Sequence, residues 1–328
     1  MKKILSLLLA LSLVFTLGAC AAKPTEEPYT KTDVKVFAIS GPTGIGMVNL
    51  MDKAEKNETK ENYKFTVVAS PNEVVSKISN KEADIAAVST NIAAKLYNVT
   101  NGGIKVLAVN TLGVLNVITK DGKKIESLAE LKGKTVYTTG QGANPEFIIN
   151  YLLNKNGVNP ATDLKINFKA EGSELLTVWN TEPEAIIIAP QPVATSIVLK
   201  YEGSAIAADL TKEWEKVDNA SALMMGCVIV RNEFLEQHPK AVQNFMEEYA
   251  ASVNAVTENL DNTAALCEAK GIIPKAAMAK KAIPYCNICF VTGNEMKTKL
   301  SGYLTVLENA DKTSIGGKLP TDEFYYEK

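Results

Sequence analysis

Residues 34–51, VKVFAISGPTGIGMVNLM, decide the fold class of this chain. Five of the first six residues, all but Lys35, are β-branched or apolar, and the segment SGPTG at 40–44 that follows them favours a turn. Apolar residues then recur at helical spacing. The stretch therefore predicts a strand over 34–39, a turn, and a helix over 45–56.

The same alternation of strand and helix continues along the chain. Further strands are expected at 63–69, 84–88 and 104–110, with helices at 71–78 and 92–97 between them. Strands and helices that alternate across short loops are typical of parallel sheets flanked by helices. The sequence thus predicts an α/β fold.

The pattern then repeats at a distance of 101 residues. Glu73-Val74-Val75-Ser76 aligns with Glu174-Leu175-Leu176-Thr177, and the apolar strand at 85–88 aligns with 186–189. Two units of the same architecture could also agree in this way without duplication. The second unit has expected strands from 134, at 164–169 and at 185–189, and expected helices at 146–155 and 174–179. Either origin predicts two similar α/β lobes.

The last third of the chain does not begin a third unit. An apolar run at 223–231 precedes expected helices at 233–259, 275–281 and 295–308. The first unit is too small to cover both faces of its sheet, so we expect the chain to return to it. Lobe 1 then comprises residues 31–112 plus 224–328, and lobe 2 comprises 113–223. Two crossings, near 110–113 and 222–225, would form a hinge.

The amino terminus has the pattern of an export signal. Lys2 and Lys3 precede an apolar segment at 4–16 that is too short to span a bilayer, and Leu17-Gly18-Ala19-Cys20 resembles the bacterial lipoprotein cleavage box. The resemblance implies that residues 1–19 are a lipoprotein signal peptide and that Cys20 carries diacylglycerol and an acyl chain such as palmitate. The chain would then be lipid-anchored on the extracytoplasmic face of the cell membrane, with 20–32 as a flexible tether. A plain secretory signal is the alternative.

Composition excludes several classes of function. The 328 residues carry a formal net charge of −2 without a basic stripe, so nucleic acid is not an expected partner. The single histidine, His238, argues against His-based metal sites and against most Ser-His or Cys-His catalysis. We therefore expect no enzyme and no metal. His238 itself, which precedes Pro239, is interpreted as a surface cap at a helix start.

Two nucleotide-binding motifs are incomplete in this sequence, because residues of the wrong type stand at their required positions. Gly41 and Gly46 could end a phosphate loop, but Met47 and Val48 stand where Lys and Ser or Thr are needed. Gly140 and Gly142 are followed by Pro145, where the dinucleotide fingerprint needs Gly or Ala. No cofactor is expected.

Four segments resemble a known family. They are 36–51 with its SGPTG turn, the Glu73-to-Lys77 helix followed by Ala-Asp-Ile-Ala at 83–86, Leu-Lys-Gly-Lys-Thr-Val at 131–136, and Gly-Gln-Gly at 140–142. Together they are similar to solute-binding proteins of ABC importers, in the nitrate, sulfonate and thiamine-precursor (NMT1-like) group. The resemblance implies the type II periplasmic-binding-protein fold and a monomer whose two lobes close on one small molecule. It also implies delivery of that molecule to an ABC permease, with the ATPase on a different chain.

The candidate site follows from the expected sheets. In open α/β sheets, ligands bind outside the carboxyl ends of the strands, next to helix N-termini. Loops at those ends consist of small or neutral polar residues, although turns and helix caps favour the same residues everywhere. The candidate ligand-binding residues are Ser40, Gly41, Pro42, Thr43, Ser89, Thr90, Asn91 and Asn110 in lobe 1, and Gly140, Gln141, Gly142, Asn144 and Gln191 in lobe 2.

The basic residues suggest the charge of the ligand. Arg231 is the only arginine of the 35 basic residues, and it is interpreted as a surface or capping residue. A neutral or weakly charged heterocyclic or polar ligand is therefore expected over a strong anion, although helix N-termini can bind anions through the backbone alone. Candidate stacking partners, each also a candidate core residue, are Tyr137, Trp179, Trp214 and Tyr285. Glu171 could accept an amino group or simply start a helix.

Other interpretations remain open. Cys227, Cys267, Cys286 and Cys289 could be buried thiols or include a structural disulfide such as Cys227 with Cys286, whereas redox catalysis by the Cys-Asn-Ile-Cys segment lacks its usual structural context. The function could also be a sulfonate-binding or other anion-binding importer component, a binding sensor, or an enzyme resembling thiamine-pyrimidine synthases.

Overall fold

Two β-sheets organise the computed structural model, which describes residues 29–69, 71–218 and 220–327. The expected signal peptide, its cleavage site at Cys20 and most of the tether lie outside the described residues. Among the described helices, none is both long enough and apolar enough to cross a membrane.

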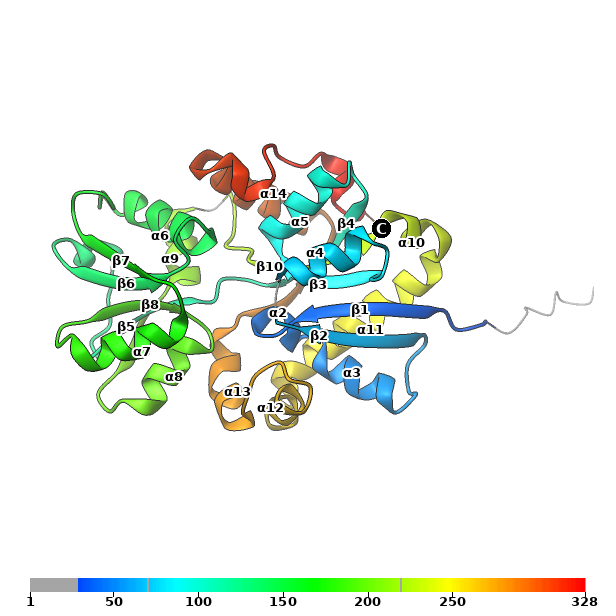
Figure 1. Ribbon diagram of the computed structural model, residues 1–328, viewed down its shortest axis with the longest axis horizontal. Coiled ribbons are helices and arrows are strands. Elements are labelled where there is room, and N and C mark those ends of the chain that lie inside the picture. The colour runs from blue at the N-terminus through cyan, green and yellow to red at the C-terminus, as the bar shows by residue number, and fades with distance from the viewer. Residues whose placement is uncertain (1–28, 70, 219, 328) are drawn as a thin grey trace, which may run out of the picture. The chain divides into compact units, whose positions relative to one another are not determined.

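The first sheet has six strands in the order β11-β4-β10-β3-β1-β2 (Figure 1). Strands β1 to β4 run parallel to one another, and β10 and β11 run antiparallel to them. The strands span β1 (Asp33–Ile39), β2 (Asn62–Val68), β3 (Ile85–Ser89), β4 (Ile104–Thr111), β10 (Gly226–Arg231) and β11 (Ile288–Val291).

The second sheet repeats this pattern with five strands in the order β7-β6-β8-β5-β9. Its one antiparallel strand, β5, occupies the place that β10 has in the first sheet, and each of these strands follows a crossing from the other sheet. The prediction of two α/β lobes with mainly parallel sheets is confirmed, and the antiparallel strands are β10 and β11 in the first sheet and β5 in the second. The strands span β5 (Leu115–Thr119), β6 (Thr135–Thr139), β7 (Lys165–Lys169), β8 (Ile186–Pro190) and β9 (Ala205–Asp209).

Helices cover both faces of the first sheet (Figure 1). Successive strand residues alternate between two apolar clusters, so that Phe37 faces one cluster and Val36 the other. The first cluster includes α4 (Pro71–Ser79), α5 (Thr90–Val99) and α14 (Gly293–Ala310). The second includes α3 (Val48–Glu55), α11 (Pro239–Glu258), α12 (Leu260–Ala269) and α13 (Ala276–Ala282).

The second sheet is covered in the same way. One face packs on α7 (Gly172–Thr181) and α8 (Val193–Lys200), and the other on α6 (Asn144–Lys155) and α9 (Leu210–Val217). The first cluster runs on from one sheet to the other, because Trp214 of α9 contacts Tyr303 of α14 with ring centroids 5.7 Å apart. The lobes therefore share part of a core.

The two crossings lie against each other. A Cβ on Gly113 would stand 2.3 Å from Thr211 Oγ1 and 2.5 Å from a methyl carbon of Leu223. Only glycine therefore allows these segments of the chain to approach so closely. Asn287 donates from Nδ2 to the Gly113 carbonyl at 2.7 Å. This contact fixes the first crossing against the segment that leads into β11.

The carboxyl-terminal third differs most from expectation. The helix expected over 233–259 is broken into α10 (Asn232–Gln237) and α11, since Pro239 cannot continue the hydrogen-bond ladder of α10. His238 occupies the N-cap position of α11 but makes no side-chain cap, and its half-buried ring lies 5.0 Å from that of Phe234. His238 thus lies at a helix start as expected, but its side chain is half-buried and does not cap the helix. Strands β5, β9 and β11 and helices α8, α9 and α12 were not expected.

Candidate functional site

The candidate loops lie at the carboxyl ends of four parallel strands. In the first sheet, residues 40–43 follow β1 and lead into α2 (Pro42–Ile45), while Ser89 ends β3 and stands at the N-cap of α5. In the second sheet, residues 140–144 join β6 to α6, and Gln191 follows β8. Each sheet thus presents two polar loops at the same edge.

One hydrogen bond joins the loops of the two sheets. Asn144, the first residue of α6, donates from Nδ2 to Oδ1 of Asn91 at 3.1 Å. Ser89 donates its hydroxyl proton to the same oxygen at 2.7 Å. The loops after β3 and β6 therefore come within reach of one small molecule.

Several candidate residues hold the loops in place. Thr90 is fully buried and donates to the Met224 carbonyl at 2.7 Å, which ties α5 to the second crossing. Asn110, 1% exposed, donates to the Thr43 carbonyl at 3.0 Å. The Gly41 amide donates to the Ile272 carbonyl at 2.9 Å. These three groups therefore already have partners inside the protein.

Gln191 is also turned inward. Its side chain is 2% exposed, donates to Asn116 Oδ1 of β5 at 2.6 Å, and accepts from the hydroxyl and the amide of Thr195. By contrast, Gln141 is exposed, and Ser40 and Thr43 are half-buried. The candidate residues whose side chains are not fully engaged inside the protein are thus concentrated in the loops at 40–43, 89–91 and 140–144.

Gly226 packs against two candidate residues and was not predicted from the sequence. A Cβ there would lie 2.7 Å from both Asn110 Oδ1 and Thr43 Cγ2, so a larger residue would displace the loop after β1. The only signal in the sequence is a glycine that opens a strand just after a crossing. Nothing in that pattern specifies which loop it contacts.

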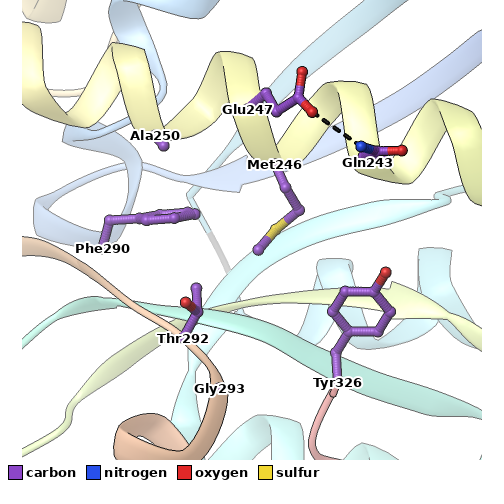
Figure 2. A pocket seen from close by; sticks show the side chains of 8 residues that line it. All are labelled: Gln243, Met246, Glu247, Ala250, Phe290, Thr292, Gly293 and Tyr326. Carbon is purple, nitrogen blue, oxygen red and sulfur yellow. Dashed lines mark hydrogen bonds between the residues drawn. The ribbon is translucent and has the colours of Figure 1, made fainter. Parts of the chain in front are cut away.

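Two hollows of the described surface lie away from these loops. A hollow of about 240 Å³ lies between α11, β11 and Tyr326 near the end of the chain, with Met246 and Phe290 pointing into it (Figure 2). A wider one, of about 930 Å³, lies at the amino ends of β6 and β8, where it contacts Lys134 and Glu184. Neither includes a residue of the candidate loops, although Tyr137, a candidate stacking partner, lines the wider one.

The aromatic candidates divide into core and surface. Trp214 is fully buried between Tyr151 and Tyr303, and Trp179 is 4% exposed within the core of the second sheet. Neither tryptophan presents a face to a solute. Tyr137 is half-buried, with Lys169 Nζ 5.9 Å from its ring centroid, and Tyr285 is 40% exposed.

Arg231 lies beside the amino end of β3, at the opposite end of that strand from the candidate loops. Its guanidinium binds Asp84 at 2.9 Å and Glu233 at 3.0 Å, and its Nε donates to the Ala83 carbonyl at 3.0 Å. Because Asp84 precedes β3 and Ser89 ends it, the length of that strand separates Arg231 from the candidate loops. Arg231 thus occupies the N-cap position of α10 as expected, but its largely buried side chain forms ion pairs and does not cap the helix. Glu171 is an exposed N-cap of α7, in line with a simple helix start.

The four described cysteines are free thiols. Cys227 and Cys286 belong to separate apolar clusters on the two faces of the first sheet, so the Cys227–Cys286 disulfide is wrong. Burial raises the pKa of all four thiols, to about 12 for Cys267 and Cys289. Such thiols are largely protonated near neutral pH and unsuited to redox catalysis.

Comparisons with known proteins agree with the sequence resemblance. A model of the NMT1/THI5-like family matches residues 60–262, more than half of the chain. No curated protein sequence matches the chain.

Several solved structures share the fold, which is that of type II periplasmic binding proteins. An ABC transporter protein from Parabacteroides distasonis aligns with a TM-score of 0.75 and 23% identity over 91% of this chain and 100% of that one. The periplasmic aliphatic sulphonate binding protein SsuA from Escherichia coli aligns with a TM-score of 0.71 and 10% identity, over 91% and 93%. The periplasmic nitrate-binding protein NrtA from Synechocystis aligns with a TM-score of 0.51 and 16% identity, over 73% and 66%.

Proposed function

The chain belongs to the NMT1/THI5-like family, and from this premise we propose that it is the solute-binding component of an ABC importer. It captures one small molecule between the loops of its two sheets and delivers it to a permease that a separate ATPase drives. It acts as a monomer and does no chemistry on the solute. The names of the similar structures, a sulphonate-binding and a nitrate-binding protein, support the class of protein.

The hydrogen bond between Asn91 and Asn144 is the observation that carries this proposal. It brings two polar loops from different sheets within reach of one molecule. A solute bound there contacts both lobes at once and stabilises the arrangement in which they are close, because its affinity for that arrangement is higher. Ser40, Thr43, Asn91, Gln141 and Asn144 are the proposed direct contacts, and the other candidate residues shape or hold the loops.

The proposed solute is neutral or weakly charged, and heterocyclic or polar. None of the candidate ligand-binding residues is basic, and Arg231 is engaged at the far edge of the first sheet. Ligand specificity then rests on neutral hydrogen bonds. An anion such as a sulfonate is the competing class and is an explicit outcome of the experiment below.

We also propose that Cys20 carries the lipid that holds the protein on the extracytoplasmic face of the membrane. The support is the Leu-Gly-Ala-Cys segment at 17–20 with its charged and apolar flanks. In this position the protein can pass a captured solute to its permease without leaving the membrane surface.

A thermal-shift screen tests the binding function. Purified protein is heated with vitamins, pyrimidines, flavins, sulfonates and amino acids, and a true ligand at 100 times its Kd adds about 2.7 kcal/mol of stability. Asn91→Ala should lose the shift, while Asn98→Ala, on the same helix α5 but bonded to the carbonyls of Ile315 and Lys318, should keep it. A shift produced only by sulfonates would reverse the ligand assignment.

Three further measurements separate the competing classes. Mass spectrometry should recover the bound compound unchanged, whereas a converted compound would indicate an enzyme. Uptake of the labelled compound should stop in cells that lack the chain, whereas intact uptake would indicate a sensor. Small-angle scattering should show a smaller radius of gyration with the compound bound, and identical curves would contradict closure of the lobes.

A further inference from the structure

Asn144 has a buried side-chain oxygen without a partner. The residue is 7% exposed, and while its Nδ2 donates to Asn91, its Oδ1 forms no hydrogen bond with any described residue. Buried amide oxygens are nearly always paired, since an unpaired one forfeits its hydration. The oxygen stands at the one hydrogen bond that joins the candidate loops of the two sheets. This position makes a bound solute its natural partner.

The surroundings determine which atom of the amide is unpaired. Asn91 directs Nδ2 at the Ser314 carbonyl, 3.4 Å away, and a carbonyl oxygen can only accept. Asn91 therefore turns Oδ1 towards Asn144, which must present its own Nδ2 to make the bond. The atom left over on Asn144 is thus the oxygen, an acceptor.

The backbone around Asn144 offers few donors for an anion. The Gly142 amide donates to the Glu146 carboxylate at 2.7 Å, the Ala143 amide donates to the Gly140 carbonyl at 3.1 Å, and Pro145 has no N–H. The first turn of α6 also carries the acidic side chain of Glu146. This loop is therefore poorly prepared for an anion, although helix N-termini commonly bind one.

We infer that Oδ1 of Asn144 accepts a hydrogen bond from an N–H or O–H group of the solute and selects solutes that carry such a donor. The inference rests on the proposed function and narrows its substrate class to uncharged or cationic molecules with a donor group. A solute of the same shape without that donor leaves the oxygen buried and unpaired. Its affinity falls by roughly five- to 150-fold, the equivalent of a buried partner left unsatisfied.

Matched pairs of small heterocycles test the selection. Isothermal titration compares 4-aminopyrimidine with pyrimidine and adenine with purine, which differ only in an exocyclic amino group, and includes ethanesulfonate as an anion. The wild-type protein should bind at least one amino compound at least fivefold more tightly than its partner. In Asn144→Ala, the ratio of the two dissociation constants should be close to one.

Two further variants separate selection from folding. Asn144→Asp keeps an acceptor oxygen but loses the Nδ2 that donates to Asn91 Oδ1, so overall affinity should fall while the preference for the amino compound persists. Asn98→Ala serves as the matched control, because Asn98 also has an unpaired buried Oδ1 but sits against the 315–318 segment, and its ratio should equal that of the wild type.

The outcomes distinguish this inference from the proposed function. Equal binding of both members of each pair by the wild type, or an unchanged ratio in Asn144→Ala, overturns the role of Asn144 and leaves solute binding intact. Preference for ethanesulfonate overturns the donor selection and supports the anion class. Failure of the wild type to bind any of these compounds contradicts the proposed neutral-heterocycle ligand itself.

Discussion

The guanidinium of Arg231 lies 2.9 Å from the carboxylate of Asp84, at the edge of the first sheet opposite the one that Ser89 reaches. The two side chains are only 14% and 9% exposed. The arginine also donates from Nε to the Ala83 carbonyl. The single arginine of the chain is therefore committed to joining β10 to the start of β3.

Loss of Arg231 should cost stability and leave solute affinity unchanged. Arg231→Gln leaves Asp84 without its charged partner, which typically costs about 3 kcal/mol for a largely buried pair. Urea unfolding measures this loss. The control is Lys297→Gln, whose exposed partners Asp322 and Glu327 predict a loss below about 1 kcal/mol. A tenfold weaker Kd for the solute in Arg231→Gln would instead place the arginine in the site.

Asp218 should make stability depend on acid pH. Burial raises the pKa of this carboxyl, but hydrogen bonds from the Ser221 and Tyr151 hydroxyls and from the Ser221 and Ala220 amides outweigh burial and lower it to about 2, from an ordinary value of 3.8. The carboxylate thus adds stability above pH 4, which is lost as the pH falls from about 4 to about 2.

The variant Asp218→Asn tests this dependence. Because the carboxyl is only half-buried and water screens it, we expect a loss of about 1 kcal/mol at pH 7. Unfolding free energies measured from pH 7 to pH 2 should show the gap between wild type and variant narrowing below pH 4. A gap that stays constant to pH 2 would assign the loss to the changed hydrogen bonds rather than to the charge.

Gly226→Ala should weaken solute binding as well as stability. The added methyl group would lie 2.7 Å from Thr43 Cγ2 and must displace the loop after β1, at a cost of about 1 to 3 kcal/mol. The control is Gly103→Ala, in which the new Cβ meets Thr100 Cβ at 3.0 Å just before β4 begins, at the end of that strand away from the candidate loops. Titration should show weaker binding only in Gly226→Ala. Equal affinities in the two variants would separate Gly226 from the site.

The sequence predicts elements well where periodicity and turn residues coincide. The strand expected at 34–39 is observed as Asp33–Ile39, and the helix expected at 71–78 as Pro71–Ser79. Strands β5 and β9 were missed for local reasons. Leu115–Thr119 is buried throughout and lacks alternation, and Ala205–Asp209 is rich in alanine, a residue depleted in strands. These two strands form because they pair with segments that are distant in the sequence, and local sequence patterns do not reveal such pairing.

The candidate site, like the fold, could be predicted from the sequence only in part. Strand order places polar loops at one edge, and their residue types can be read from the sequence. Whether a particular side chain is free depends on tertiary partners: Gln191 is engaged by Asn116 of β5, a strand that was not expected. The unpaired oxygen of Asn144 depends likewise on Ser314, far along the chain. The sequence predicts the candidate loops, whereas only the structure shows which of their side chains already have a partner inside the protein.

Cys20→Ala should release the protein from the membrane. Without the thiol, no lipid can be attached at the proposed cleavage site, so the full chain should move to the soluble fraction or remain unprocessed. Fractionation of cells fed a labelled fatty acid measures both effects. Cys289→Ala is the control and should remain labelled and membrane-bound, since that cysteine lies within the fold. Labelled membrane protein in Cys20→Ala would refute the lipid anchor.

Solute affinity should be nearly independent of salt. Added salt screens charge pairs over a Debye length of about 10 Å at 0.1 M, but it has little effect on desolvated neutral hydrogen bonds. If Thr43, Asn91 and Gln141 hold a neutral solute, its Kd should change less than about twofold between roughly 0.05 and 0.5 M sodium chloride. Gln141→Ala should weaken binding by about five- to 150-fold at every salt concentration, because the solute group that Gln141 bonds would be buried without a partner. A steep salt dependence in the wild type would mean that charge holds the solute and would favour an anion such as a sulfonate.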